Sequence, residues 1–154
     1  MTNSRRVAVD TNILVYAEDY GSDPRSAKAV RLFDWLGPQG YCVPVQVAGE
    51  FMRVLTRKGK RSPARAEAAL SQWSANAEFL PTTAEAFCAA LDLMTKHKLD
   101  IWDAVILSVS AESGCSLLLS EDMQDGFVWR GLTIVNPFAG SLHPLLQSAI
   151  DEQP

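Results

Sequence analysis

Hydrophobic and polar positions follow two different spacings along the chain. Short apolar runs of the length of a strand occur at five places, at Arg5–Val9, Tyr41–Val43, Glu78–Leu80, Cys115–Leu119 and Leu132–Val135. Between these runs, apolar residues recur every three or four positions, as they do on the buried face of a helix. Strands that alternate with helices predict an α/β fold with a mainly parallel sheet.

Capping residues mark where the predicted helices begin. The predicted N-caps are Asp23, Ser62, Thr82 and Asp100. Asp23 and Ser62 are each followed by proline, which is favoured at the first position of a helix. Glu85 stands three residues after Thr82, which is the spacing of a capping box. Each of these signals separates one predicted helix from the segment before it.

The length of 154 residues is that of one domain. We expect this domain to span residues 1–140, followed by a tail at 141–154 that is partly helical. No apolar run approaches the ~20 residues of a membrane helix, and no signal sequence precedes the first strand. We therefore expect a cytoplasmic protein with no membrane partner. The cysteines, three in number and far apart, are predicted to be reduced thiols of the core rather than zinc ligands.

Four carboxylates interrupt or end apolar segments, and they are Asp10, Glu50, Asp103 and Asp122. An isolated buried carboxylate costs several kcal/mol or takes up a proton, so such positions indicate a cationic partner. Right-handed βαβ units bring the ends of strands and the starts of the next helices to one edge of the sheet, so we expect the four to meet. Crowding should raise at least one pKa. A site with only oxygen ligands favours Mg²⁺, with Mn²⁺ as a substitute.

Each carboxylate also has a structural alternative. Asp10 could cap the helix that follows it, and Glu50 could pair with Arg53 or Arg57 on its own helix. Asp103 could assist Asp100 in capping, and Asp122 could belong to an acidic turn. Asp125, which precedes a glycine, is either a further ligand or a turn residue.

Basic residues gather just after Glu50, although the net charge of the chain is −4. The residues between 53 and 65 include no acidic side chain, and the cations there are Arg53, Arg57, Lys58, Lys60, Arg61 and Arg65. A cationic strip beside a carboxylate site suits a polyanion that must be held near a metal. We therefore predict that these residues contact the backbone of a polyanion.

Five segments together resemble the PIN-domain ribonucleases. They are residues 10–17 (DTNILVYA), 49–51 (GEF), 102–104 (WDA), 120–122 (SED) and 131–138 (GLTIVNPF). The resemblance spans about Val7 to Phe138 and includes all four acidic positions. It implies a three-layer αβα fold with a five-stranded, mainly parallel sheet, and cleavage of RNA that depends on Mg²⁺ or Mn²⁺.

The resemblance also implies roles for individual residues and partners. Asp10, Glu50, Asp103 and Asp122 would be catalytic; Asp10, Asp103 and Asp122 would bind the metal, with Glu50 and Asp125 as further possible ligands. Thr11, Asn12 and Ser120 would hydrogen-bond to these carboxylates from behind. Small proteins of this kind are often VapC-type toxins of toxin–antitoxin pairs, so a cognate antitoxin and a homodimer are expected.

Three other functions remain open from the sequence. The first is a PIN nuclease of RNA processing that is not a toxin. The second is a phosphohydrolase of the haloacid-dehalogenase type, whose nucleophile strand needs a second aspartate where this chain has Asn12. The third is a catalytically silent module that binds RNA or protein, against which the complete set of four carboxylates argues.

Overall fold

The computed structural model describes residues 5–19 and 22–151, and these form one sheet with helices on both of its faces. The strands are β1 (Val7–Val9), β2 (Tyr41–Pro44), β3 (Ala77–Leu80), β4 (Leu117–Leu119), β5 (Val128–Trp129) and β6 (Leu132–Val135). Their order across the sheet is β3-β2-β1-β4-β6-β5. All five predicted strands are present, and every pair among them is parallel.

The prediction of five strands was wrong by one, because β5 adds a sixth. This strand has two residues and pairs antiparallel with β6. A turn through Arg130 and Gly131, both with positive φ, connects the two strands. The apolar residues Phe127 to Trp129 include this edge strand, but its two paired residues are too few to show the alternation of a strand, and the pairing with β6 defines it.

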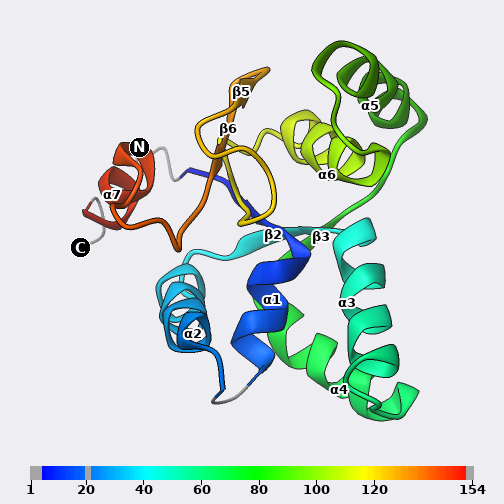
Figure 1. Cartoon of the computed structure of the whole chain (residues 1–154), viewed down its shortest axis with the longest axis vertical. Coiled ribbons are helices and arrows are strands. Elements are labelled where there is room, and N and C mark those ends of the chain that lie inside the picture. The colour runs from blue at the N-terminus through cyan, green and yellow to red at the C-terminus, as the bar shows by residue number, and fades with distance from the viewer. Residues whose placement is uncertain (1–4, 20–21, 152–154) are drawn as a thin grey trace.

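The helices form two layers, and the handedness of the chain explains which face each one covers. They are α1 (Thr11–Glu18), α2 (Pro24–Leu36), α3 (Val45–Arg57), α4 (Pro63–Ser74), α5 (Ala84–His97), α6 (Ile101–Glu112) and α7 (Pro144–Asp151). From β1 to β3 the chain moves outward in one direction, and right-handed crossovers keep α1 to α4 on one side. It then returns past β1 to β4, so α5 and α6 cover the other side (Figure 1).

The predicted caps are confirmed at three of the four helices. Asp23, Ser62 and Asp100 each accept a hydrogen bond from a backbone N–H in the first turn of their helices. The fourth prediction was wrong by one residue, because the cap of α5 is Thr83 and not Thr82. The Thr83 hydroxyl accepts from the Ala86 N–H, which moves Glu85 out of the capping-box position.

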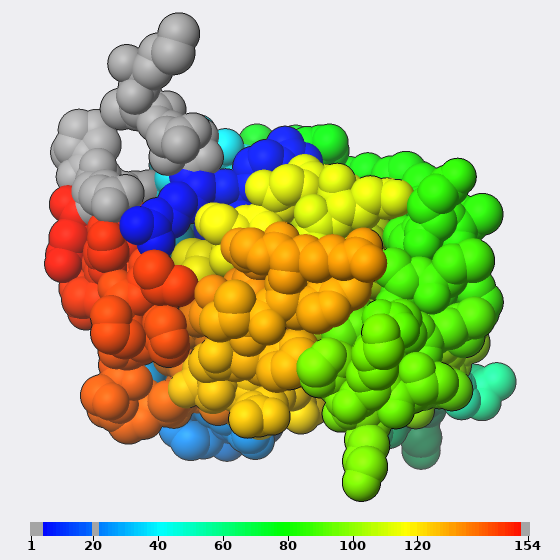
Figure 2. Space-filling view, turned by 90° about the horizontal axis from the view of Figure 1, so that it is seen from above, coloured from blue at the N-terminus to red at the C-terminus, as the bar shows by residue number. Residues whose placement is uncertain are grey.

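The core lies where the central strands meet the helices. The three residues of β1, the three of β4 and the four of β6 are all buried, and so is most of α6. Seen from above, α7, the β5–β6 hairpin and α5 lie in a row across one face (Figure 2). Leu146 of α7 is fully buried in the core.

None of the described helices is both long and apolar enough to cross a bilayer. Residues 152–154 of the predicted tail lie outside the described residues.

Candidate functional site

The carboxylate residues lie where the direction of the chain across the sheet reverses. β1 and β4 are parallel neighbours, but the chain leaves β1 toward β2 and leaves β4 toward β6. The loops after such strands diverge and open a crevice at the carboxyl edge of the sheet. Asp10 directly follows β1, and Asp122 follows β4 by three residues. Strand order therefore places both aspartates at the mouth of this crevice.

Asp10 is the most buried of the acids, with 4% of its surface exposed. Its carboxylate caps α1 by accepting from the Thr11 N–H at 2.7 Å. It also accepts from the Ser120 hydroxyl at 2.7 Å and from the Asn12 side-chain amide at 3.3 Å. The capping alternative is thus confirmed as a structural role of Asp10. Because every one of these donors is neutral, the cap leaves the negative charge itself without a cation.

The Asn12 amide links Asp10 to Asp122. Its NH₂ group donates to Asp122 at 3.1 Å as well as to Asp10. Its oxygen accepts from the Glu121 backbone N–H at 3.2 Å. Since that N–H can only donate, it fixes which end of the amide faces the carboxylates. Asn12 therefore holds two acids at a set separation with two neutral N–H donors.

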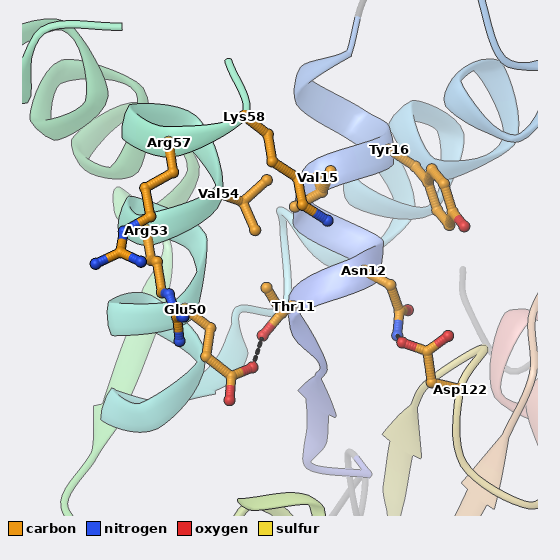
Figure 3. A pocket seen from close by; sticks show the side chains of 10 residues that line it. All are labelled: Thr11, Asn12, Val15, Tyr16, Glu50, Arg53, Val54, Arg57, Lys58 and Asp122. Carbon is orange, nitrogen blue, oxygen red and sulfur yellow. Dashed lines mark hydrogen bonds between the residues drawn. The ribbon is translucent and has the colours of Figure 1, made fainter. Parts of the chain in front are cut away.

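Glu50 reaches the same crevice from the second turn of α3. Its carboxylate accepts from the Thr11 hydroxyl at 2.7 Å (Figure 3). It also accepts from the Gln46 side chain at 2.9 Å. The structure records no ion pair from Glu50 to Arg53 or Arg57, all three of which are described residues. The alternative of a local ion pair therefore does not describe Glu50, whose contact across elements is with α1.

Burial and mutual repulsion shift two of the acids. The pKa of Asp10 is raised to about 6, mainly by removal from water and to a smaller extent by the nearby Glu50 and Asp122, against hydrogen bonds from Ser120 and Thr11 that lower it. The pKa of Asp103 also rises to about 6, first through burial and then through Asp10, Asp100, Glu50 and Asp122. The four carboxylates therefore act on one another electrostatically. Asp125 is not among the groups that shift Asp10 or Asp103.

Asp125 lies in the loop after β4 and has a structural partner. Its carboxylate accepts from the Asn136 backbone N–H at 2.8 Å. Gly126 follows with a positive φ of 84°, as a turn requires. Of the two alternatives for Asp125, the contacts favour the turn residue.

The oxygen donors at this edge suit a hard divalent cation in their chemistry. In the part of the chain that the structure describes, no three Asp, Glu, His or Cys side chains already converge closely enough to hold a metal ion. Neutral donors keep the acids apart, with the Asn12 NH₂ group between two of them. The pKa of Asp10 and of Asp103 is raised first by burial and then by repulsion from the other acids, and a bound dication would offset both effects. The residues therefore fit such an ion by donor type, and their convergence on it would need side-chain movements.

A pocket of about 580 Å³ joins two of the four acids, Glu50 and Asp122, to part of the basic strip, whereas Asp10 and Asp103 do not line it. Its polar lining includes Asn12, Glu50 and Asp122, together with Arg53, Arg57 and Lys58. Figure 3 shows Arg53 and Arg57 on the exposed side of α3, and Lys58 extending toward α1. The pocket is thus acidic at the sheet edge and basic along α3.

The other three cations of the strip lie outside this lining. Arg61 forms an ion pair with Glu18 at the end of α1. Lys60 and Arg65 are exposed in the loop after α3 and in the first turn of α4. The structure thus brings half of the strip to the pocket.

One group of polar residues beside the pocket was not predicted from the sequence. The Tyr16 hydroxyl donates to Glu121 at 2.7 Å, and the Arg25 guanidinium pairs with the same carboxylate at 2.6 Å. Arg25 also lies 4.3 Å from the centre of the Tyr16 ring. Burial and the bond to Glu121 raise the pKa of Tyr16 to about 12, so it stays protonated. Glu121 lies about one hundred positions after Tyr16 and Arg25 in the chain, and no local sequence pattern predicts their contact.

Comparison with known proteins agrees with the fold. Residues 7–124 match the family model described as "PIN domain". A comparison with curated proteins found no match. Among solved structures, VapC20 of Mycobacterium tuberculosis, titled a sarcin-ricin loop cleaving toxin, has a TM-score of 0.62 and 23% identity over 73% of this chain and 86% of its own. A toxin-antitoxin complex from Klebsiella pneumoniae has a TM-score of 0.64 and 20% identity over 86% of this chain and 98% of its own. FitAcB from Neisseria gonorrhoeae has a TM-score of 0.62 and 14% identity over 86% of this chain and 99% of its own.

Proposed function

This chain belongs to the PIN domain family, and from that premise we propose that it is an endoribonuclease that depends on Mg²⁺, with Mn²⁺ as a substitute. The observation that carries the proposal is the Asp10 carboxylate. It is buried, its hydrogen-bond donors are all neutral, and its charged neighbours are other acids. A buried carboxylate without a cationic side chain is costly, and a bound metal ion would supply the missing positive charge.

Asp10, Asp103 and Asp122 would hold the metal, and Glu50 would complete the set. When bound, a divalent cation lowers the pKa of a water and neutralises charge on a phosphodiester. The Thr11 hydroxyl fixes one oxygen of Glu50, and Gln46 fixes the other. Glu50 so held can accept a hydrogen bond from the attacking water on the pocket side. The contacts of Asp125 give no support for including it.

Several neutral side chains would set the shape of this site. Ser120 orients Asp10, and Asn12 spaces Asp10 from Asp122. Partners that orient metal ligands contribute strongly to affinity, so these residues belong to the proposed site although none carries a charge. Arg53, Arg57 and Lys58 would hold RNA phosphates along α3, beside the acids.

A purified-protein assay tests the nuclease. Single-stranded and structured RNA are incubated with wild type in Mg²⁺, in Mn²⁺ and in EDTA, and with the variants Asp10→Asn and Asp34→Asn. Asp34 is an exposed acid of α2 and serves as a matched control. We expect cleavage only with a divalent ion, none with Asp10→Asn, and full activity with Asp34→Asn. Equal cleavage in EDTA, or an active Asp10→Asn, would contradict the proposal.

A second measurement tests metal binding independently of RNA cleavage. Calorimetric titration with Mn²⁺ should show binding to wild type and to Asp34→Asn, and weaker binding to Asp10→Asn. No heat of Mn²⁺ binding to wild type would favour the catalytically silent module. The family match and the asparagine at position 12 leave nothing that favours the haloacid-dehalogenase alternative.

We further propose that the protein is the toxin of a toxin–antitoxin pair, with an antitoxin and a second copy of itself as partners. The support is the fold shared with structures that include a toxin-antitoxin complex. Induced expression should arrest growth in wild type but not in Asp10→Asn, and a small gene beside the toxin gene should relieve the arrest. Active enzyme without arrest would favour a PIN nuclease of RNA processing. Size-exclusion chromatography with light scattering tests the homodimer.

A further inference from the structure

Trp102 differs from the other three tryptophans in its packing. Trp35, Trp73 and Trp129 are partly buried and pack against the hydrophobic core. Trp102 does not belong to that set, and 50% of its surface is exposed. Among the described residues, none places an aromatic ring or a cation against the Trp102 indole. The side chain is therefore a large flat apolar surface that folding leaves half open to solvent.

The position of Trp102 is fixed at the candidate site. It lies in the first turn of α6, where its backbone N–H donates to the Asp100 cap at 2.9 Å. The next residue is Asp103, and α6 begins at the carboxyl edge of the sheet because it leads back into β4, the parallel neighbour of β1. The turn that carries the indole is thus anchored by a cap on one side and adjoins the carboxylates on the other.

The charges around Trp102 indicate which part of a nucleotide could bind its indole. Asp100 and Asp103 stand on either side of it in the sequence, and both are acids at the start of α6. The basic side chains of the pocket belong to α3, where they line its wall together with Val54. A phosphate would be repelled beside Trp102 and attracted to α3. A neutral flat group is the part of a nucleotide that suits the indole.

We propose that Trp102 is a binding subsite for a nucleobase, on which the base next to the scissile phosphate stacks. This inference rests on the proposed ribonuclease function and adds to it how the substrate is oriented. The phosphates would follow Arg53, Arg57 and Lys58, the cut would occur at the acids, and the base would lie on the α6 side. Stacking of bases on aromatic side chains tolerates any sequence because every base has a flat face. The subsite therefore favours unpaired RNA, since bases within a duplex cannot be reached in this way.

Binding to a short RNA tests this subsite directly. The probes are a 12-nucleotide oligoadenylate and a ribose-phosphate chain of the same length without bases, both measured by fluorescence anisotropy in Mg²⁺. All proteins carry Asp10→Asn so that the RNA stays intact. To this background are added Trp102→Ala, Trp102→Phe or Phe87→Ala.

Phe87 is a matched control because it is also an exposed aromatic on this helix pair, with 38% of its surface exposed. It lies near the far end of α6, because Thr83 bonds to Glu112 and the Ala86 carbonyl accepts from Ser108. We expect Trp102→Ala to weaken oligoadenylate binding on the order of tenfold, as for loss of one base–aromatic stack. Trp102→Phe should retain most of the affinity, and Phe87→Ala should not change it. The chain without bases should bind all variants equally.

Three outcomes would overturn the inference. In the first, Trp102→Ala binds oligoadenylate as its background does. In the second, Trp102→Ala loses affinity equally for the chain without bases, which would mean a change of fold or charge. In the third, wild type neither binds nor cleaves RNA, which removes the proposed function as well. Cleavage by wild type together with an unchanged KM for Trp102→Ala in an active background would overturn the subsite alone.

Discussion

The two ends of α1 each bury a carboxylate, and they treat its charge in opposite ways. Glu18, at the C-terminal end, is 7% exposed; it pairs with Arg61 and accepts from the Trp73 indole N–H at 2.6 Å. Asp10, at the N-terminal end, is buried as deeply but meets only neutral donors and other acids. One helix therefore carries both a neutralised and an unneutralised buried charge.

The difference separates a structural use of charge from a functional one. Glu18 with its two donors joins α1 to α4 and to the loop that precedes α4. At the end of a helix the dipole disfavours an anion, so an arginine there is needed for stability. At the start of the helix the dipole favours an anion, so Asp10 can be tolerated without a cation of its own. The negative charge of Asp10 is therefore available to a cationic ligand.

The largest expected effects, on RNA cleavage and on stability, come from removing the charge of Asp10 or of Glu18. We expect Asp10→Asn to lower RNA cleavage by more than about a hundredfold, as loss of a preorganised electrostatic contact to the reaction does. Its free energy of unfolding in EDTA should not fall, because the variant removes an unneutralised charge. Glu18→Gln should cleave RNA at a near-normal rate but unfold at lower denaturant. Cleavage rates and urea titrations of both variants measure this, and a reversed pattern would refute the comparison.

The stability of the metal-free protein should fall as pH rises from about 4 to about 6. The pKa of Asp10 is about 6 in the folded chain against an ordinary value of 3.8. In this window the folded state binds more protons than the unfolded state, so unfolding becomes easier with rising pH, by about 2 to 3 kcal/mol for Asp10. Asp103 contributes in the same direction.

Urea unfolding in EDTA at several pH values checks this dependence. Subtracting the Asp10→Asn curve gives the contribution of Asp10 together with its electrostatic effect on Asp103, since the remaining groups titrate in both proteins. At pH 7.5, added Mn²⁺ should raise the free energy of unfolding of wild type because it binds the ionised acids of the folded state. A difference curve that is flat between pH 4 and 6 would show that Asp10 is not held out of water.

The neutralised end of α1 should depend on its arginine. We expect Arg61→Ala to lower the free energy of unfolding by about 2 kcal/mol, because it leaves Glu18 buried without its cation; we place the value below that of a fully buried pair since Arg61 is partly exposed. Arg65→Ala, at an exposed position in the next helix, is the control and should change stability by less than about 0.5 kcal/mol. Thermal and urea unfolding measure both. Equal losses of stability in the two variants would show that Arg61 does not stabilise the fold by neutralising Glu18.

The smallest effect concerns the cations that remain for a ligand. Arg57 lines the pocket and forms no ion pair recorded among the described residues. Arg57→Ala should weaken RNA binding several-fold and reduce the slope of log affinity against log salt by about 1. Arg31→Ala, an exposed change on α2, should leave the slope unchanged. A slope unaffected by Arg57→Ala would place the RNA backbone elsewhere.

The fold was predictable from the sequence because its signals are local. The apolar runs and the Asp23, Ser62 and Asp100 caps act over a few residues each. Parallel connections then leave little freedom in where the strand ends meet. The acids could be predicted to gather for the same reason, since Asp10 and Asp122 each follow a strand by a short interval.

The errors arose where two neighbours compete or where an element is very short. Thr82 and Thr83 are equivalent in type, and only the backbone of the turn decided that Thr83 caps α5. The strand β5 required β6 beside it.

The sequence by itself determined the strands, the helices and the edge of the sheet at which four acids are placed, because periodicity and chain direction depend on neighbouring residues. Only the tertiary structure decided which charges are neutralised. Arg61 reaches Glu18 across 43 residues, whereas Arg57, four positions earlier, faces the pocket. Ion pairing depends on which side chains are within a few ångströms after folding, and that distance is set by the packing of α1 against α3 and α4 rather than by any spacing along the chain.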